Sequence, residues 1–188
     1  LQSMNIKNYI RNYFRNLYVR TMEEAYDCGY KELARSLSNG GTCLDCGANS
    51  GKHYVQLQSM MGLAPERYTG IEWDRDAVMQ ARGNGINVIQ GDLNRPLPFD
   101  DNTFECVFGF SVLEHLLNGC LWMTEAGRLL KKGGELIIIT PNISTFFNIA
   151  LLVCGKMCSS GPHPDSRMLL KSEAPLQVST IDNPDVEG

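Results

Sequence analysis

Residues 44–51 read Leu-Asp-Cys-Gly-Ala-Asn-Ser-Gly, a short apolar stretch with one acid that runs into two glycines. The run at 42–46 is typical of a buried strand, and the residues from 51 onward have the pattern of a helix. Glycines between a strand and a helix let a ligand approach the backbone, and the first turn of the helix offers it free N–H groups. This stretch therefore predicts a βα unit with a ligand-binding loop.

The alternation of strand and helix continues along the chain. Further apolar runs of strand length lie at 68–73, 86–90, 106–110 and 135–140. Helix-like segments lie between the runs at about 51–61, 74–82 and 118–131. This spacing indicates βαβ units, and right-handed crossovers between parallel strands give an open, doubly wound α/β sheet. Its ligand crevice is expected at the carboxyl ends of the strands.

The second predicted strand ends in Gly70-Ile71-Glu72-Trp73-Asp74. A carboxylate at this place can accept hydrogen bonds from both hydroxyls of a ribose. Glu72 suits this role because it still belongs to the strand, whereas Asp74 has the position of an N-cap for the next helix. Trp73 either lies against an adenine ring or packs in the core.

The third predicted strand ends in Gln90-Gly91-Asp92-Leu93, where Asp92 can accept a hydrogen bond from an adenine amino group. Asp45, Glu72 and Asp92 thus stand at the ends of successive strands. Together these acids predict a ligand that has a nucleoside part and an amino-acid part but no phosphate.

Two phosphate-binding loops are alternatives for the first glycine loop. A P-loop has the pattern G-x-x-x-x-G-K-[ST], but Gly47 to Lys52 is one residue short and His53 stands where a hydroxyl is needed. A dinucleotide loop has the pattern G-x-G-x-x-G, and Asn49 occupies its middle glycine. Asp45 disfavours both, because a carboxylate repels phosphates and attracts an ammonium group.

In order and spacing, the motifs resemble those of the class I S-adenosylmethionine-dependent methyltransferases, specifically their small methyltransferase-domain group. The resemblance covers roughly residues 40–142 and rests on Asp45-x-Gly47-x-x-x-Gly51, Glu72, Gly91-Asp92, the run Pro-Phe-Asp-Asp-Asn-Thr-Phe-Glu-Cys-Val at 98–107, Ser-Val-Leu-Glu-His-Leu at 111–116 and Leu-Lys-Lys-Gly-Gly at 130–134. It implies a Rossmann-like sheet, S-adenosylmethionine as the cofactor and methyl transfer as the reaction.

The resemblance also implies roles for particular residues of the cofactor site. The methionine part is expected on Asp45, Gly47 and Gly51, with Ala48 in the same loop. The ribose is expected on Glu72, the adenine on Asp92 and Leu93, and the sulfonium near a floor of Phe110 and Ser111. Trp73, from the strand-end pattern above, is a further candidate for the adenine. Because displacement at a sulfonium needs alignment above all, a general base is required only if the acceptor must lose a proton. His115, the histidine after the fourth strand, is a weak candidate for that base.

The chain departs from the family in two places. Phe108-Gly109-Phe110-Ser111 replaces the Asn/Asp-Pro-Pro-aromatic motif of members that methylate DNA bases or glutamine amides, which disfavours those acceptors. After Asn142 the family continues into a helix and an antiparallel hairpin, whereas this sequence continues into one apolar helix-like segment and a proline-rich tail. We therefore expect either a fragment or an incomplete acceptor side. The open edge of the fifth strand is then expected to be covered by 146–154, by the tail or by a second molecule in a dimer.

We divide the chain into three predicted segments. Residues 1–41 form an N-terminal helical cap, of which 1–3 resemble a tag remnant before Met4. Residues 42–158 form the methyltransferase domain. The segment 159–188 has four of the eight prolines and no aromatic residue, and it is expected to be an irregular tail.

Composition limits the protein to a few classes. The 188 residues, 43% of them hydrophobic and 20% charged, fit a globular protein of one domain. The net charge of −4 argues against a nucleic-acid partner, and no apolar run reaches the roughly 18 residues of a membrane span. No cluster of His, Cys and Asp has metal-ligand spacing, and Cys43 and Cys46 lie within a predicted strand. We therefore expect buried free thiols, no metal and a cytoplasmic location.

The sequence thus predicts a methyltransferase that uses S-adenosylmethionine. Thr140-Pro141-Asn142 resembles members that act on small molecules, so a small-molecule acceptor is expected, although its identity is open. The alternative is a non-catalytic methyltransferase-like module that binds the cofactor or serves as an interaction scaffold.

Overall fold

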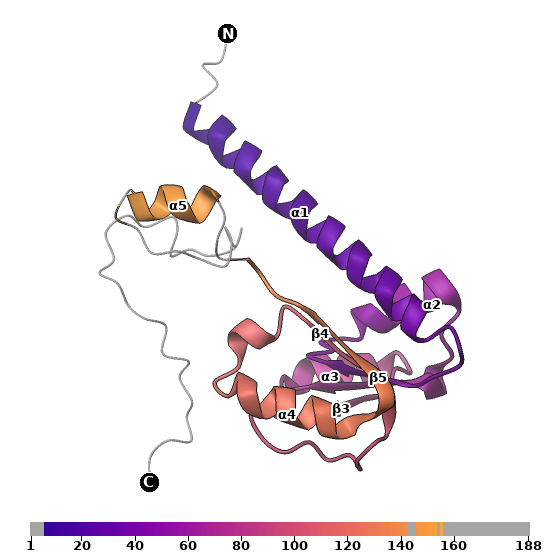
Figure 1. Ribbon diagram of the computed structural model, residues 1–188. Coiled ribbons are helices and arrows are strands. Elements are labelled where there is room, and N and C mark those ends of the chain that lie inside the picture. Colours follow the sequence, from indigo (N-terminus) through magenta and orange to yellow (C-terminus); the bar gives the residue numbers. More distant parts are fainter. Residues whose placement is uncertain (1–5, 143–145, 154, 156–188) are drawn as a thin grey trace. The chain divides into compact units, whose positions relative to one another are not determined.

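The computed structural model describes residues 6–142, 146–153 and 155. Contacts between Cα atoms divide the chain into one unit of Val19–Asn142 and another of Leu1–Tyr18 with Ile143–Gly188. The long helix α1 (Ile6–Ser36) runs across this division, and α5 (Phe146–Val153) belongs to the second of these units (Figure 1). The predicted tail at 159–188 lies outside the described residues. No helix within the described part has both the length and the apolarity to cross a bilayer.

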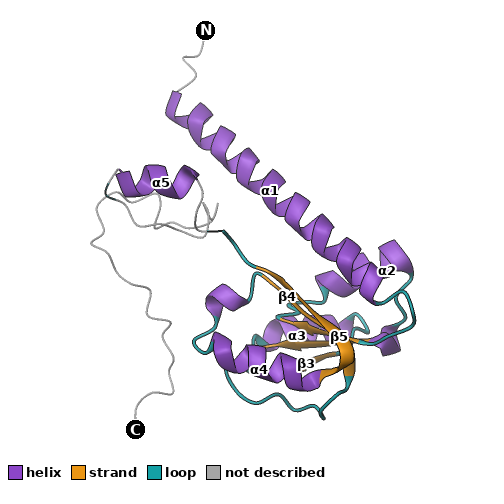
Figure 2. Cartoon of the chain, in the orientation of Figure 1, coloured by secondary structure: helices purple, strands orange, loops and turns teal. Residues whose placement is uncertain are grey.

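The unit Val19–Asn142 contains a parallel sheet of five strands in the order β3-β2-β1-β4-β5, which confirms the predicted fold class (Figure 2). The strands are β1 (Cys43–Cys46), β2 (Tyr68–Glu72), β3 (Val88–Gln90), β4 (Phe104–Phe110) and β5 (Leu130–Ile139). The chain runs outward from β1 to β3 and then returns to place β4 beside β1. The strand order therefore reverses between β1 and β4, the position at which ligands bind in such sheets.

Helices connect most of the strands. They are α2 (Lys52–Met61), α3 (Arg75–Gly83) and α4 (Gly119–Leu129), with short 3₁₀ turns η1 (Pro65–Arg67) and η2 (Leu113–His115). Helix α3 begins where the Asp74 carboxylate accepts hydrogen bonds from the N–H groups of Asp76 and Ala77, so the predicted N-cap is confirmed.

Both faces of the sheet are buried, as the apolar strands require. One face packs against α1, α2 and α3 through residues that include Leu33, Leu57 and Val78. The other packs against α4 through Trp122, Ala126 and Leu129. Strand residues alternate between the two cores, so Cys43 and Cys46 point to opposite faces. Both are buried free thiols, as the sequence predicts.

Strand β5 begins earlier than the sequence pattern predicts. Leu130 already pairs with Phe104, whereas the sequence analysis placed 118–131 in a helix and began the strand at 135. The early part is polar and contains glycine, so its pattern is that of a turn. Pairing with β4 overrides this local preference, and the Lys131 ammonium adds a 2.6 Å ion pair to Glu105.

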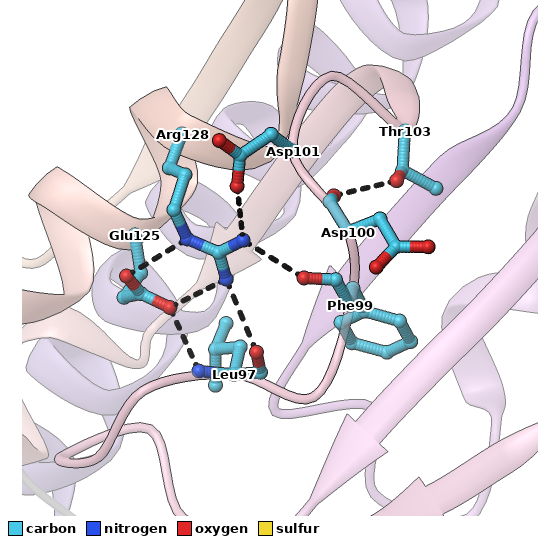
Figure 3. A network of polar contacts seen from close by, with 7 residues as sticks. All are labelled: Leu97, Phe99, Asp100, Asp101, Thr103, Glu125 and Arg128. Carbon is cyan, nitrogen blue, oxygen red and sulfur yellow. Dashed lines mark hydrogen bonds and ion pairs between the residues drawn. The ribbon is translucent and has the colours of Figure 1, made fainter.

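A single arginine holds the connection between β3 and β4, which has no helix of its own. Arg128 of α4 donates hydrogen bonds to the carbonyls of Leu97 and Phe99 and forms ion pairs with Glu125 and Asp101 (Figure 3). The Glu125 carboxylate in turn accepts from the Leu97 N–H at 2.8 Å. The pKa of Glu125 is lowered, first by its bond to Arg128. This network fixes residues 97–101 against α4.

Arg128→Ala is expected to lower the free energy of unfolding by about 2 kcal/mol, because the substitution leaves a mostly buried carboxylate and two carbonyls without their donor. Urea denaturation followed by circular dichroism measures the difference. Arg20→Ala is the matched control, since Arg20 makes an exposed i,i+4 pair with Glu24, and it should leave the unfolding curve in place. Equal shifts for both variants would show that the network does not hold the connection.

Candidate functional site

The glycine-rich loop leaves β1 through a series of left-handed residues. Gly47 (φ 81°), Asn49 (φ 49°) and Gly51 (φ 86°) all adopt positive φ. At Gly47 a Cβ atom would lie 2.5 Å from Val112, and at Gly51 it would lie 2.6 Å from Ile86. Both glycines are therefore required by the backbone and by close packing, in addition to the ligand access that the sequence predicts.

The N–H groups of this loop already have acceptors within the protein. Those of Gly47 and Ala48 donate to the Ile71 carbonyl, and that of Gly51 donates to Ala48. The Asn49 N–H donates to Glu72, and the Ser50 N–H donates to the Asn49 side chain. The loop thus has no N–H left to cradle a phosphate, whereas the first turn of α2 directly follows it.

Asp45 lies at the end of β1 and is fully buried. The Tyr68 hydroxyl donates to its Oδ2 atom at 2.5 Å, while Oδ1 has no hydrogen-bond partner among the described residues. Burial raises the pKa of Asp45 to about 7, although Tyr68 and the nearby Lys52 ammonium favour the ionised form. A positive charge bound near the loop would therefore favour the ionised form of the Asp45 carboxyl group.

Glu72 connects the end of β2 to the glycine loop. Its Oε2 atom accepts from the Asn49 N–H at 2.8 Å, and its Oε1 atom accepts from the Asp74 N–H at 3.0 Å. Each carboxylate oxygen has a second lone pair, so both can also accept a hydroxyl of a ligand. Trp73 is 63% exposed, which excludes the interpretation of it as a core aromatic.

The residues after β3 lie against the same edge. The Gly91 N–H donates to the Glu72 carbonyl at 2.9 Å, which brings this segment beside β2. Asp92 is half-buried. Its Oδ1 atom accepts hydrogen bonds from the backbone N–H and the side-chain amide of Asn94, and its Oδ2 atom lies 3.4 Å from Arg95 Nε. Leu93 is buried in the core on the α4 face.

The carboxyl end of β4 carries an aromatic cluster that includes residues from the N-terminal helix. Phe110 is buried, and the Tyr26 ring stacks on it with centroids 5.6 Å apart. Ser111 has φ 55° and is tied to the end of β5 by a 2.7 Å bond from its N–H to the Ile139 carbonyl. The Tyr26 hydroxyl lies 3.0 Å from Ser111 Oγ. The sequence analysis missed Tyr26, because the i, i+4 spacing of Tyr26 and Tyr30 shows only that they share a helix face.

The aromatic cluster at the end of β4 also contains a histidine. His53 of α2 is buried, and its Nδ1 atom lies 2.7 Å from the Tyr30 hydroxyl. Burial lowers the pKa of His53 to about 4, with Lys52 as the smaller cause, so the ring is neutral near pH 7. His115 instead lies exposed on η2. Of the two histidines in the described part of the chain, His53 is the one enclosed beside the carboxyl end of β4, and the sequence analysis used it merely to exclude a P-loop.

The structure thus brings the glycine loop, Glu72 and Ser111 together at one edge of the sheet. Asp92 follows β3, the strand that pairs with β2. Asp45 is beneath the loop, and the indole of Trp73 faces solvent. Among the described residues, no three or more His, Cys, Asp or Glu side chains are grouped so as to hold a metal ion.

Comparisons with known proteins show the family of the chain. Residues 44–138, about half of the chain, match the family described as "Methyltransferase domain". A protein of Mycobacterium tuberculosis named as a probable S-adenosylmethionine-dependent methyltransferase is 28% identical over 148 residues, which are 78% of this chain and 47% of that protein. A similarly named protein of Mycolicibacterium smegmatis is 33% identical over 82 residues, 43% of this chain and 32% of that protein. The chain thus spans about half or less of the length of these relatives.

Solved structures share the fold at low sequence identity. An S-adenosylmethionine-dependent methyltransferase of Thermotoga maritima matches with a TM-score of 0.51 and 22% identity, over 77% of this chain and 67% of that one. The MccD protein matches with a TM-score of 0.53 and 18% identity, over 70% of this chain and 63% of that one. Together with the family match to residues 44–138, the parallel sheet and its loop show that the chain belongs to the methyltransferase domain family, among the class I S-adenosylmethionine-dependent methyltransferases.

Proposed function

We propose that this chain binds S-adenosylmethionine across the carboxyl ends of β1, β2 and β4 and transfers its methyl group to a small-molecule acceptor. The observation that carries the proposal is the junction of Glu72 with the glycine loop, whose N–H groups are all satisfied within the protein. A carboxylate suits ribose hydroxyls, and a loop with no free donors suits a ligand without phosphate. The names of the relatives support the same cofactor.

The donor set of the site fits this cofactor. Glu72 would accept the ribose hydroxyls, and the first turn of α2 would meet the methionine carboxylate through its N–H groups. The Asp45 carboxyl would favour the ammonium group by its field, since its side chain is fully buried. Asp92, Leu93 and Trp73 would line the adenine side, with Ala48 and both glycines shaping the loop.

The bound cofactor supplies an electrophilic methyl group, and the protein's part is to align the acceptor with it. Displacement at a sulfonium requires the attacking atom in line with the leaving sulfur, so positioning accounts for much of the rate. His53 is buried against Tyr30, which leaves it unsuited to take a proton from an acceptor in this arrangement. The exposed His115 is the histidine of η2 that could do so if the acceptor must lose a proton.

Glu72→Ala is expected to weaken cofactor binding tenfold or more, because a charged bidentate hydrogen bond is worth roughly 1.5–3 kcal/mol. Isothermal titration calorimetry measures the change. Asp74→Ala is the control: it removes the N-cap of α3 and costs about 1 kcal/mol of stability, but its effect on affinity should be much smaller. The reverse order of the two effects would place the ribose elsewhere.

The buried carboxyl group of Asp45 should make cofactor binding depend on pH. Its pKa is about 7 in the free protein, and a cation bound nearby lowers that pKa, so binding releases a proton. Affinity should therefore rise between about pH 5.5 and about pH 7, and calorimetry in buffers of different ionisation enthalpy should detect the released proton. Asp45→Asn should remove both effects. His53 does not titrate in this range, since its pKa is about 4. Equal pH dependence in the wild type and Asp45→Asn would contradict this assignment.

The alternative, a non-catalytic methyltransferase-like module, differs in turnover. A methyltransferase both binds the cofactor and transfers its methyl group, whereas the module only binds it. Calorimetry with S-adenosylmethionine measures binding, and methyl transfer to a panel of small acceptors measures turnover. Methyl transfer to any acceptor of the panel would support the enzyme. Cofactor binding without transfer to any of them would favour the non-catalytic module.

A further inference from the structure

Tyr26 lies outside the residues that match the methyltransferase family, yet it contacts the site. The match begins at residue 44, whereas Tyr26 belongs to α1. Helix α1 approaches the sheet closely at Gly29, where a Cβ atom would lie 2.5 Å from Ile139 and 2.6 Å from Phe110. This glycine lets the helix rest on the ends of β4 and β5. Tyr26, one turn earlier on the same helix, is thereby held beside Ser111.

The ring of Tyr26 is fixed in position and has a face suited to a positive charge. Phe110 stacks on it at an interplanar angle of 18°, and the hydroxyl is bonded to Ser111. The Lys52 ammonium lies over the ring, 5.8 Å from its centroid. The face of an aromatic ring carries negative charge, and cations within about 6 Å of the centroid are attracted to it. The contact with Lys52 shows that this ring already attracts a cationic group of the protein, whose place a bound sulfonium would take or share.

We propose that Tyr26 is a specificity-determining residue of the cofactor site, whose ring attracts the sulfonium of S-adenosylmethionine and so favours it over the demethylated product. This inference rests on the proposed function, which puts the sulfonium beside Phe110 and Ser111. S-adenosylmethionine and S-adenosylhomocysteine differ there by a methyl group and one positive charge. A ring quadrupole distinguishes the two by charge, so Tyr26 retains the substrate and favours release of the product.

The test is the ratio of the two dissociation constants, measured by calorimetry for S-adenosylmethionine and S-adenosylhomocysteine with the same protein. Tyr26→Phe keeps the ring and should keep the wild-type ratio within about twofold. Pentafluorophenylalanine in place of Tyr26 has nearly the same shape but a reversed quadrupole. It should weaken S-adenosylmethionine about threefold to tenfold more than S-adenosylhomocysteine. Tyr26→Leu should change the ratio in the same direction.

Tyr30→Phe is the matched control, because it removes the hydroxyl bonded to His53 from the same helix face and should leave the ratio unchanged. Equal weakening of both ligands by fluorination and by Tyr26→Leu would overturn the inference and assign Tyr26 a packing role only. A wild-type chain that binds neither ligand would instead overturn the proposed function on which the inference rests. Melting temperatures of all variants verify that the fold is retained.

Discussion

The position of β1 between two parallel neighbours is the constraint on which the site depends. Cys43–Cys46 pairs with β2 on one side and with β4 on the other, so this short strand is hydrogen-bonded along both edges. Its carboxyl end must therefore open between the ends of β2 and β4, where the strand order reverses. The glycine loop, Glu72 and Ser111 meet at this edge because all three follow strands that point the same way.

Burial of Asp45 beneath the loop is the main electrostatic feature of the site. The Asp45 carboxyl group is shielded from solvent, and one of its oxygens has no hydrogen-bond partner among the residues that the structure describes. Such burial is costly, and the Tyr68 hydroxyl offsets only part of that cost. Such a group contributes little to the stability of the free protein, but it stabilises a cation that binds nearby. The same local charge deters phosphates, which agrees with a loop whose N–H groups are already satisfied.

The N-terminal helix connects the core to the site. From Val19 onward α1 belongs to the same unit as the sheet, and Leu33 of the helix and Leu37 directly after it are buried in the core of that unit. Tyr26 and Tyr30, on the same side, approach Phe110 and His53. A helix that packs so close to this edge adds the rings of Tyr26 and Tyr30 to the aromatic surface that Phe108 and Phe110 of β4 already provide there.

The sequence alone determined the order of strands and helices, the glycine loop and the N-cap at Asp74, because each depends on residues close together in the chain. It also placed Glu72 at the end of a strand, since a strand end is a local pattern. Contacts over long sequence separations decided the rest: pairing with β4 began β5 at Leu130, and packing buried Asp45 and brought Tyr26 to Ser111. Such contacts leave no periodic signal, because one tyrosine on a helix face has the same local pattern whether it meets the core or a ligand.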